Sequence, residues 1–430
     1  MKTTMRILLA TVCMLGIFAS QAFAAGYGIY EWSARGNALG GTLIARADDP
    51  SAVAYNPAGI TQLEGINVMG GMTIIAPNAT IKVGDSGSDG KGSNTAWTIP
   101  HAYYTHQMSD RAWFGLGVFS RVGLGTEYTD DESWAGRYNC SYAGIKAVSV
   151  NPNLAFKVTD NLSFAVGFEA MIMEFAFDNA TDPRTLSGSD YDYDDNTYDI
   201  KTKLRAQGWA PGWNVGLHYK PFDWLAFGAT YHSQIDMTVE GKAHFDANPG
   251  GKAYLADPTL NAMFGKRSNA QGTAPIPAST SFGVMVKPTE RLSIEVDAIH
   301  TDWSSYTDLT FEIDSMPSDI VSDKNWHDTW RYQVGAEYRL YDWMDLRAGY
   351  VFDESPIQDE YADYAVPGND RQMVNTGVGM RFDQWTVDLS YSYLWMKGRD
   401  IEARPHDGVP ESRLEGGHSH LIGMSVSYSF

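Results

Sequence analysis

Cysteine and positive charge are both scarce in this sequence. Its 430 residues include only two cysteines, Cys13 and Cys140, and 32 Lys and Arg stand against 52 Asp and Glu. Because Cys13 lies in an N-terminal segment that we expect to be removed, no intrachain disulfide can form. With a formal net charge of −20 and no basic stripe to neutralise phosphates, the chain is poorly suited to nucleic acid, and we expect no such partner.

Long hydrophobic runs are also absent after the N-terminal segment, and mean hydropathy is −0.29. This excludes a helical membrane protein, whose spans need about 20 consecutive apolar residues. A soluble secreted protein and a β-barrel both remain, since barrel strands hide a membrane face in alternate residues. The 42 glycines and the 13% aromatic content suit short strands and tight turns better than helices.

The N-terminus has the three parts of an export signal. Lys2 and Arg6 form a short positive region, residues 7–18 form an apolar stretch, and residues 22–24 read Ala-Phe-Ala. This pattern predicts a signal peptide over residues 1–24 that is cleaved from the mature chain.

The C-terminal segment alternates strictly between apolar and small residues. The apolar set is Ile422, Met424, Val426, Tyr428 and Phe430, with Gly or Ser between its members. A period of two assigns each set to one face of a strand. A strand that stops on Phe430 has the form of the signal for the outer-membrane assembly machinery, with Tyr428 and Phe430 as its main residues.

Similar alternation recurs near residues 148–157, 292–297, 374–382 and 385–395. Six tight turns separate such segments, at Ser109–Arg111, Thr159–Asn161, Pro221–Asp223, Pro288–Glu290, Tyr341–Asp342 and Asp383–Gln384. Polar segments that we interpret as long loops lie near 85–94, 123–145, 179–206, 240–277, 304–328, 354–370 and 399–416. With a first strand near 66–84 and a last near 418–430, this predicts an all-β fold, a transmembrane antiparallel barrel of fourteen strands over residues 66–430. Trp224, Trp343 and Trp385 lie beside the tight turns, where a periplasmic aromatic girdle is expected.

Residues 25–65 do not follow the strand pattern and have too little apolar bulk to fold alone. They form either a disordered periplasmic tail or a hatch that plugs the barrel. The inferred lumen face carries Lys157, Glu295, Asp297, Glu337, Arg347 and Arg381, and the segment carries Arg35, Arg46, Asp48 and Asp49. These charges could hold a hatch in place, although an open channel could present the same charges to water.

Two rival classes are an outer-membrane hydrolase and a general diffusion porin. A hydrolase needs a nucleophile, a base and an orienting group together, whereas the candidate histidines are scattered: His232, His244, His300, His327 and His406. We therefore expect no catalytic residues, no cofactor and no metal. The acidic run Asp190–Asp195 could bind a cation, but a solvated loop is the simpler interpretation.

Several collinear motifs resemble the FadL family of outer-membrane transporters for long-chain fatty acids and aromatic hydrocarbons. They are Ala25-Gly26-Tyr27 with Glu31, Asn56-Pro57-Ala58, Gly123 to Tyr128, and Arg347 to Pro356 followed by Asp370-Arg371. The resemblance covers essentially the whole mature chain. It implies a fourteen-stranded barrel in the outer membrane of a Gram-negative bacterium, plugged by a hatch over residues 25–65.

The resemblance also implies that hydrophobic substrates leave sideways into the bilayer at a kink in the third strand. Here the kink would lie at Arg121, Val122 and Gly123, and the motif Asn56, Pro57 and Ala58 would approach it. A lateral exit has a physical basis, because a hydrophobic solute gains free energy by staying out of water. Gly123 tolerates broken pairing, although it could also be an ordinary barrel glycine.

Two further expectations concern the substrate. Met171, Met173 and Phe175 alternate with Phe164, Val166 and Phe168, so they point inward and form either a hydrophobic pocket or packing against the hatch. Family members for fatty acids place basic residues near the ligand carboxylate, but the matching stretches, 168–179 and 303–314, contain no Lys or Arg. This favours a neutral hydrocarbon over a fatty acid. Outer-membrane lipid and lipopolysaccharide are the expected surroundings.

Overall fold

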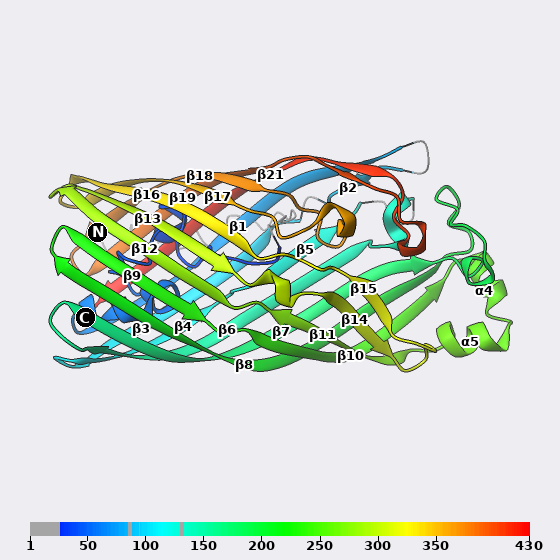
Figure 1. The fold of residues 1–430 in the computed structure, drawn as a ribbon, viewed down its shortest axis with the longest axis horizontal. Coiled ribbons are helices and arrows are strands. Elements are labelled where there is room, and N and C mark those ends of the chain that lie inside the picture. Colours follow the sequence, from blue (N-terminus) through cyan, green and yellow to red (C-terminus); the bar gives the residue numbers. More distant parts are fainter. Residues whose placement is uncertain (1–25, 85–87, 94, 130–132) are drawn as a thin grey trace, which may run out of the picture.

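The computed structural model describes residues 26–84, 88–93, 95–129 and 133–430 as one elongated barrel with the N-terminal segment inside it (Figure 1). The predicted signal peptide, residues 1–24, lies outside the described residues. None of the helices in the described part of the chain is long and apolar enough to cross a membrane.

The barrel has fourteen antiparallel strands, as the sequence predicted. Ten are continuous: β1 (Ile66–Val83), β3 (Trp97–Ser109), β6 (Tyr142–Lys157), β7 (Leu162–Thr181), β8 (Ile200–Phe222), β16 (Thr329–Tyr341), β17 (Met344–Asp353), β18 (Arg371–Phe382), β19 (Trp385–Met396) and β21 (Ser412–Ser429). Four are interrupted and consist of two segments each: β4 (Ala112–Phe119) with β5 (Gly123–Glu127), β9 (Leu225–His232) with β10 (Ile235–Ala247), β11 (Ser268–Ile276) with β12 (Ser279–Thr289), and β13 (Leu292–Thr301) with β14 (Asp308–Ile313).

Shorter helices and strands lie in the loops, and three short helices lie inside the barrel. The loops contain β2 (Gly90–Lys91), η2 (Ala135–Tyr138), η3 (Thr185–Ser187), α4 (Pro249–Tyr254), α5 (Pro258–Phe264), η4 (Trp303–Ser305), β15 (Ile320–Asp323), η5 (Asp359–Tyr361), β20 (Arg399–Ile401) and η6 (Pro405–Asp407). The interior contains α2 (Ala34–Ala38), α3 (Ala52–Tyr55) and η1 (Pro57–Gln62).

The strand faces follow the period-two pattern that the sequence predicts. On β8, Trp209, Trp213 and Leu217 are exposed on the outer face, whereas Asn214 is fully buried inside. The six tight turns lie together at one end of the barrel, and Trp224, Trp343 and Trp385 are about half exposed beside them. An aromatic girdle at that end of the barrel is thus present.

The predicted long loops are partly wrong. β10 continues to Ala247 and β11 begins at Ser268, so much of the segment 240–277 is paired strand. Likewise β5 and the start of β6 occupy both ends of segment 123–145. The reason is physical: backbone pairing does not require apolar side chains, and strands that rise beyond the lipid carry charged residues on their outer face.

The first and last strands close the barrel. β1 pairs with β21 from Asn67 opposite Ser429 to Val83 opposite Ser412. The backbone N–H of Phe430 donates a hydrogen bond of 2.9 Å to the Ile66 carbonyl. The Phe430 side chain is 75% exposed and touches only the ring of Tyr428 among its aromatic neighbours, with 4.7 Å between centroids.

Replacing Phe430 with Asp is expected to reduce insertion into the outer membrane strongly, because the assembly signal loses its terminal aromatic residue. The stability of the folded barrel should change little, because this ring is exposed rather than packed. The measurement is the amount of heat-modifiable protein in outer-membrane fractions, since closed barrels migrate differently before and after boiling. Phe430→Tyr, which keeps an aromatic ring, is the control. Normal insertion of the Asp variant would show that Phe430 has no role in assembly.

The N-terminal segment lies inside the barrel and does not form a periplasmic tail. Helix α2 packs against β18 and β19, whereas η1 packs against β6, β7 and β8, on a different part of the wall. The contact with the wall is close: a Cβ at Gly349 of β17 would lie 2.4 Å from the Leu39 carbonyl carbon. Glycine at this position therefore lets the segment touch the strand.

Candidate functional site: an opening between strands β3 and β5

The wall of the barrel is interrupted in its third strand. β4 pairs with both β3 and β6, but β5 pairs with β6 and, within the described residues, with no part of β3. Phe119 lies opposite Ser149 and Gly123 lies opposite Lys146, so three residues of this strand face two of β6. Such a bulge bends the strand and ends local pairing. The three predicted kink residues, Arg121, Val122 and Gly123, lie at this interruption.

The start of the N-terminal segment satisfies the backbone groups that the interruption frees. Ile29 N–H donates to the Arg121 carbonyl at 2.8 Å, and Gly123 N–H donates to the Tyr27 carbonyl at 2.9 Å. The Trp32 indole N–H donates to the Ser120 carbonyl at 2.7 Å. Barrel backbone cannot stay unpaired beside lipid, so these bonds make the interruption tolerable.

The hydrogen bonds of Asn56, which was expected with Pro57 and Ala58 to approach this interruption, lie elsewhere. The Asn56 amide nitrogen donates to the Ile44 carbonyl at 2.7 Å and to the Leu217 carbonyl of β8 at 2.9 Å. Its amide oxygen accepts from Ala58 N–H at 3.2 Å, which makes it the N-cap of η1 with proline at the first helical position. The Asn-Pro pair is a common helix start, and this local signal was available in the sequence.

Replacing Asn56 with Ala is expected to lower stability by about 1–3 kcal/mol, because the Ile44 and Leu217 carbonyls lose a buried donor. The transition between folded and unfolded gel mobility would shift to lower temperature. Hydrophobic uptake at permissive temperature should stay near that of the parent, since the contacts of Asn56 lie away from residues 120–123. Asn56→Asp, which keeps the acceptor and removes the donor, separates capping from the contact with β8. A large loss of uptake in a stable Asn56→Ala variant would contradict this placement.

Arg121 connects three interrupted strands. Its guanidinium lies 2.9 Å from the fully buried Glu169 carboxylate of β7. It also donates to the Ser233 carbonyl at 3.5 Å, between β9 and β10, and to the Pro277 carbonyl at 3.3 Å, between β11 and β12. A buried charge needs such partners. Glu169 lies in the stretch 168–179, which contains no Lys or Arg, and Arg121 from another strand supplies the positive charge beside it.

A cavity of about 760 Å³ crosses the wall at the interruption. At its inner end it meets Ile75, Leu394 and Leu421, the last of which is 2% exposed and faces the interior. At its outer end it meets Thr98, Pro100 and Val148, which lie on the lipid-facing side of their strands. The cavity therefore joins the barrel interior to the outer surface of the wall.

Two apolar side chains lie across this cavity. Trp97 of β3 reaches over β5, so that a Cβ at Gly125 would lie 2.0 Å from its ring. Ile29, from the N-terminal segment, lies with its Cδ1 2.5 Å from where a Cβ at Gly123 would be. The buried Trp97 indole N–H has no hydrogen-bond partner among the described residues, so no polar contact fixes the ring in this position. Neither side chain was predicted from the sequence, because neither belongs to a recognised motif.

Four charged residues also line the cavity: Glu31, Glu127, Lys146 and Arg371. Arg371 lies 2.6 Å from the Asp353 carboxylate, and the same carboxylate lies 2.8 Å from Arg331. The branched apolar residues on the inner side of the lining are Ile29, Ile75, Ile99, Val122, Ile145, Leu394 and Leu421. The interior end of the cavity is therefore apolar with a paired arginine beside it.

Met171, Met173 and Phe175 point into the barrel, as their alternation on β7 predicts, and are 0%, 0% and 6% exposed. They belong to one buried apolar cluster with Tyr27, Val122 and Trp303. None of the three lines the cavity that crosses the wall. Both alternatives, a substrate pocket and packing against the N-terminal segment, stay predictions.

The N-terminal segment is bound to the wall by ion pairs centred on Glu337 of β16. Its carboxylate accepts hydrogen bonds from Arg35 at 3.0 Å, Arg46 at 3.2 Å and Arg347 at 2.7 Å. Further pairs join Arg35 to Asp48 and Asp49, Arg46 to Glu295, Arg347 to Asp388, and Arg381 to Asp345. Lys157 takes no part in this network and instead lies 4.8 Å from the Trp113 ring centroid.

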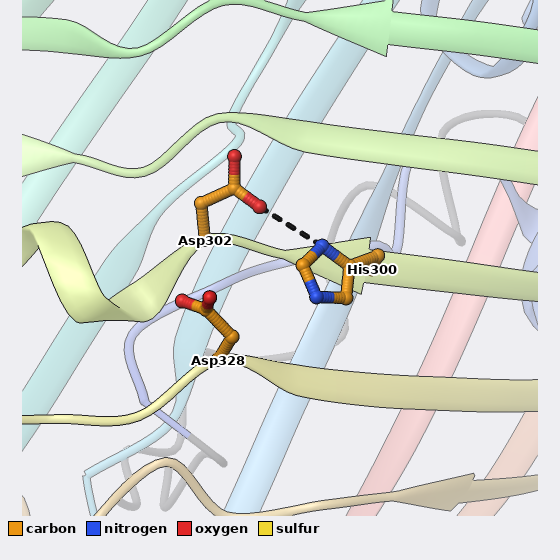
Figure 2. Close-up of side chains that lie close together, drawn as sticks. All are labelled: His300, Asp302 and Asp328. Atoms are coloured by element: carbon orange, nitrogen blue, oxygen red, sulfur yellow. Dashed lines mark ion pairs between the residues drawn. The ribbon is translucent and has the colours of Figure 1, made fainter.

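A separate cluster of polar side chains lies outside this site. Figure 2 shows His300, Asp302 and Asp328 close together, with His300 Nδ1 2.9 Å from Asp302 Oδ1. Their ligand atoms lie within 4.8 Å of one another. Asp328 also accepts a hydrogen bond of 2.8 Å from Ser304 N–H. Three such groups could bind a divalent cation, but the ion pair and this hydrogen bond account for the cluster without one.

The comparison with protein families identifies the chain. The model described as "Outer membrane protein transport protein (OMPP1/FadL/TodX)" matches residues 15–430. The chain belongs to this family. The resemblance predicted from the sequence motifs is confirmed, and so are the outer membrane as its location and transport as its general role.

Relatives of this OMPP1/FadL/TodX protein span its whole length. It is 26% identical to the long-chain fatty acid transport protein of Escherichia coli (strain K12), over 98% of each chain. It is 25% identical to outer membrane protein P1 of Haemophilus influenzae, over 100% of each chain. These names describe transport or outer membrane proteins rather than enzymes.

Solved structures share the fold. A Pseudomonas aeruginosa FadL homologue superposes with a TM-score of 0.83 at 21% identity, covering 94% of this chain and all of that chain. The Pseudomonas putida toluene transporter TodX gives 0.69 at 19% identity, covering 96% of this chain and all of that chain. At this level of identity the likeness establishes the barrel architecture alone.

Proposed function

We propose that this OMPP1/FadL/TodX protein is a passive uptake channel from which hydrophobic small molecules leave sideways, through the opening between β3 and β5, into the bilayer. The observation that carries the proposal is the cavity of about 760 Å³ that joins the interior to the lipid-facing surface. A hydrophobic solute gains free energy when it leaves water. A route that ends in lipid provides this gain, whereas a route that ends in periplasmic water does not.

The side chains across the cavity support a gated exit. Trp97 and Ile29 occupy the opening, and both are apolar, so a hydrophobic solute can replace their contacts without leaving a polar group unpaired. Each can rotate without breaking a hydrogen bond that the structure records. Arg121 is proposed as the residue that holds the opening in shape, because it binds the carbonyls at two other strand interruptions.

The N-terminal segment argues against a general diffusion porin. Its buried helices and the ion pairs at Glu337 fill the part of the barrel through which water and ions would pass. A porin needs a continuous polar path of that kind. The buried Cys140, in the loop after η2, is also a poor nucleophile, because burial raises the pKa of its thiol. The relative described as a long-chain fatty acid transport protein also favours a channel over a hydrolase.

The substrate class is proposed to be neutral hydrocarbons in preference to fatty acids. Arg371 is the cation at the inner end of the cavity; Glu31 lies near the adjacent Arg331, and both arginines share the buried Asp353 carboxylate. A fatty-acid carboxylate would have to compete with that partner and would lie near Glu31. The relatives provide both precedents, since one is described as a long-chain fatty acid transport protein and another as a toluene transporter.

Uptake assays test this proposal. In a host without its own transporter of this family, we expect the expressed protein to raise the initial rate of toluene uptake well above that of oleate. The measurement is accumulation of radiolabelled substrate at equal surface expression. Uptake of oleate without any uptake of hydrocarbon would reverse the substrate preference. Uptake of neither, with correctly folded protein, would refute the proposed function.

A further inference from the structure

A second surface lies on the outside of the barrel, apart from the transport path. On the outer face of β8, Trp209 is 66% exposed, and Lys203 and Arg205 follow at alternate positions toward the loops. Lys242 and His244 lie beside them on β10, and Arg267 immediately precedes β11. In a protein with a net charge of −20, this concentration of cations on one outer surface needs an explanation.

The strand register places like charges directly opposite one another. Arg205 of β8 is the partner of Lys242 of β10, which places two cations opposite each other, whereas Lys203 is the partner of His244, a neutral imidazole whose Nδ1 accepts a hydrogen bond of 3.2 Å from Arg267. Like charges at directly opposed positions destabilise a sheet. Within the described residues, Arg205 pairs with Asp178, but no carboxylate pairs with Lys242 or Arg267.

These side chains surround a depression of about 450 Å³ on the outer surface. Five basic residues line it: Lys146, Arg205, Lys242, His244 and Arg267. Two acidic residues, Glu174 and Glu240, also line it. An adjoining depression of about 380 Å³ shares Arg205 and is balanced in charge, because Arg137, Lys201 and Lys203 line it together with Glu127, Asp178 and Asp199. The basic excess of the first depression suits an anion with several oxygen atoms, which can accept charge-assisted hydrogen bonds from more than one cation.

The height of the depression relative to the apolar band of the bilayer indicates which kind of anion it would meet. The exposed aromatic residues Trp209 and Tyr219 are ten positions apart on β8, about 25 Å of height for a strand tilted by about 40°, which is the height of the apolar band. Arg205 lies four residues beyond Trp209, roughly 10 Å further from the bilayer centre. That is the depth of lipid headgroups, where phosphates lie.

We propose that this surface binds the phosphorylated headgroup of an outer-leaflet glycolipid, lipopolysaccharide, with Lys242 and Arg267 on its phosphate oxygens. The acyl chains of the lipid would lie against the apolar outer face of β8, below Trp209. This inference rests on the location of the protein in the outer membrane and does not depend on the proposed transport route.

The barrel offers a matched control for the test. Lys82 of β1 and Arg413 of β21 are outward-facing cations that oppose each other directly in register, as Lys242 and Arg205 do. Each of these has its own carboxylate, because Lys82 lies 2.7 Å from Asp89 and Arg413 pairs with Asp400. The two pairs of cations therefore differ in whether their charge is already neutralised.

The experiment measures binding of bisphosphorylated lipid A to the full mature barrel in a zwitterionic detergent, by native mass spectrometry. The double variant Lys242→Gln, Arg267→Gln is expected to bind about tenfold more weakly than the parent, since it loses charge-assisted hydrogen bonds. The control Lys82→Gln, Arg413→Gln should bind like the parent. Dephosphorylated lipid A should bind the parent as weakly as bisphosphorylated lipid A binds the double variant.

Three outcomes would overturn the proposal. The first is equal binding of lipid A to the parent and to the folded double variant, with folding checked by heat-modifiable mobility. The second is equal binding of phosphorylated and dephosphorylated lipid A. The third is displacement of lipid A by inorganic phosphate at concentrations comparable to the lipid, which would indicate a site for free phosphate rather than for a lipid headgroup.

Discussion

Replacing Gly123 with tryptophan is expected to reduce hydrophobic uptake to the background of a transporter-deleted host. Gly123 lines the cavity that crosses the wall, and a side chain there would point toward Ile29. An indole at this position would fill the opening beside Trp97 and displace Ile29. The measurement is the initial rate of uptake of radiolabelled toluene at equal amounts of folded barrel in the outer membrane.

Gly70→Trp is the matched control for this substitution. Gly70 lies in β1 on the outer face, and a Cβ there would have no atom within 4 Å. The control adds the same side chain to the same barrel, but into lipid. Parent-like uptake by a correctly assembled Gly123→Trp variant would exclude the lateral route and favour passage through the N-terminal segment instead.

Replacing Glu337 with Ala is expected to loosen the N-terminal segment and to destabilise the barrel by about 3–5 kcal/mol, because three arginines lose their shared carboxylate. Two of these, Arg35 and Arg46, belong to the segment itself. Conductance in planar bilayers should rise from near zero to discrete openings. The temperature at which the folded gel band disappears should fall.

Glu290→Ala provides the control, because Glu290 is exposed in the turn between β12 and β13. It changes the net charge equally and should alter neither conductance nor thermal stability. A Glu337→Ala barrel that is as stable and as non-conducting as the parent would show that hydrogen bonds and packing alone hold the segment in place.

The sequence predicted the features of the barrel that depend on local pattern. The alternation at Ile422 to Phe430 determines which side chains of β21 face lipid, and Ile422 is indeed 59% exposed whereas Ser425 is fully buried. The tight turns were also predictable, because each combines polar or proline residues within two or three positions. Strand ends beyond the lipid were not, since outward charges such as Lys242 look like loop residues.

Features of the candidate site that depend on distant contacts could not be predicted from the sequence. The pairing of Arg121 with Glu169 joins residues 48 positions apart, and no local pattern indicates it. Whether β3 and β5 pair depends on the register between strands. Side-chain periodicity shows which residues of one strand face lipid, but it does not determine how that strand aligns with its neighbour. Trp97 belongs to no motif in the sequence, and only its position over Gly125 relates it to the opening.

The pairing of β1 with β21 has a consequence for the order of assembly. The N-terminal segment directly precedes β1, yet it contacts β6 to β8 through η1 and β18 and β19 through α2. Once β1 and β21 have paired, a folded segment of this size could enter only through the two ends of the closed barrel. The segment must therefore be enclosed before the sheet closes, so that pairing of the last strand completes the barrel around it. Closing that seam joins residues at opposite ends of the chain, which makes it the step with the largest loop-closure entropy. A slow final kinetic phase, in which the segment becomes protease-resistant together with β21, is the signature of such a mechanism.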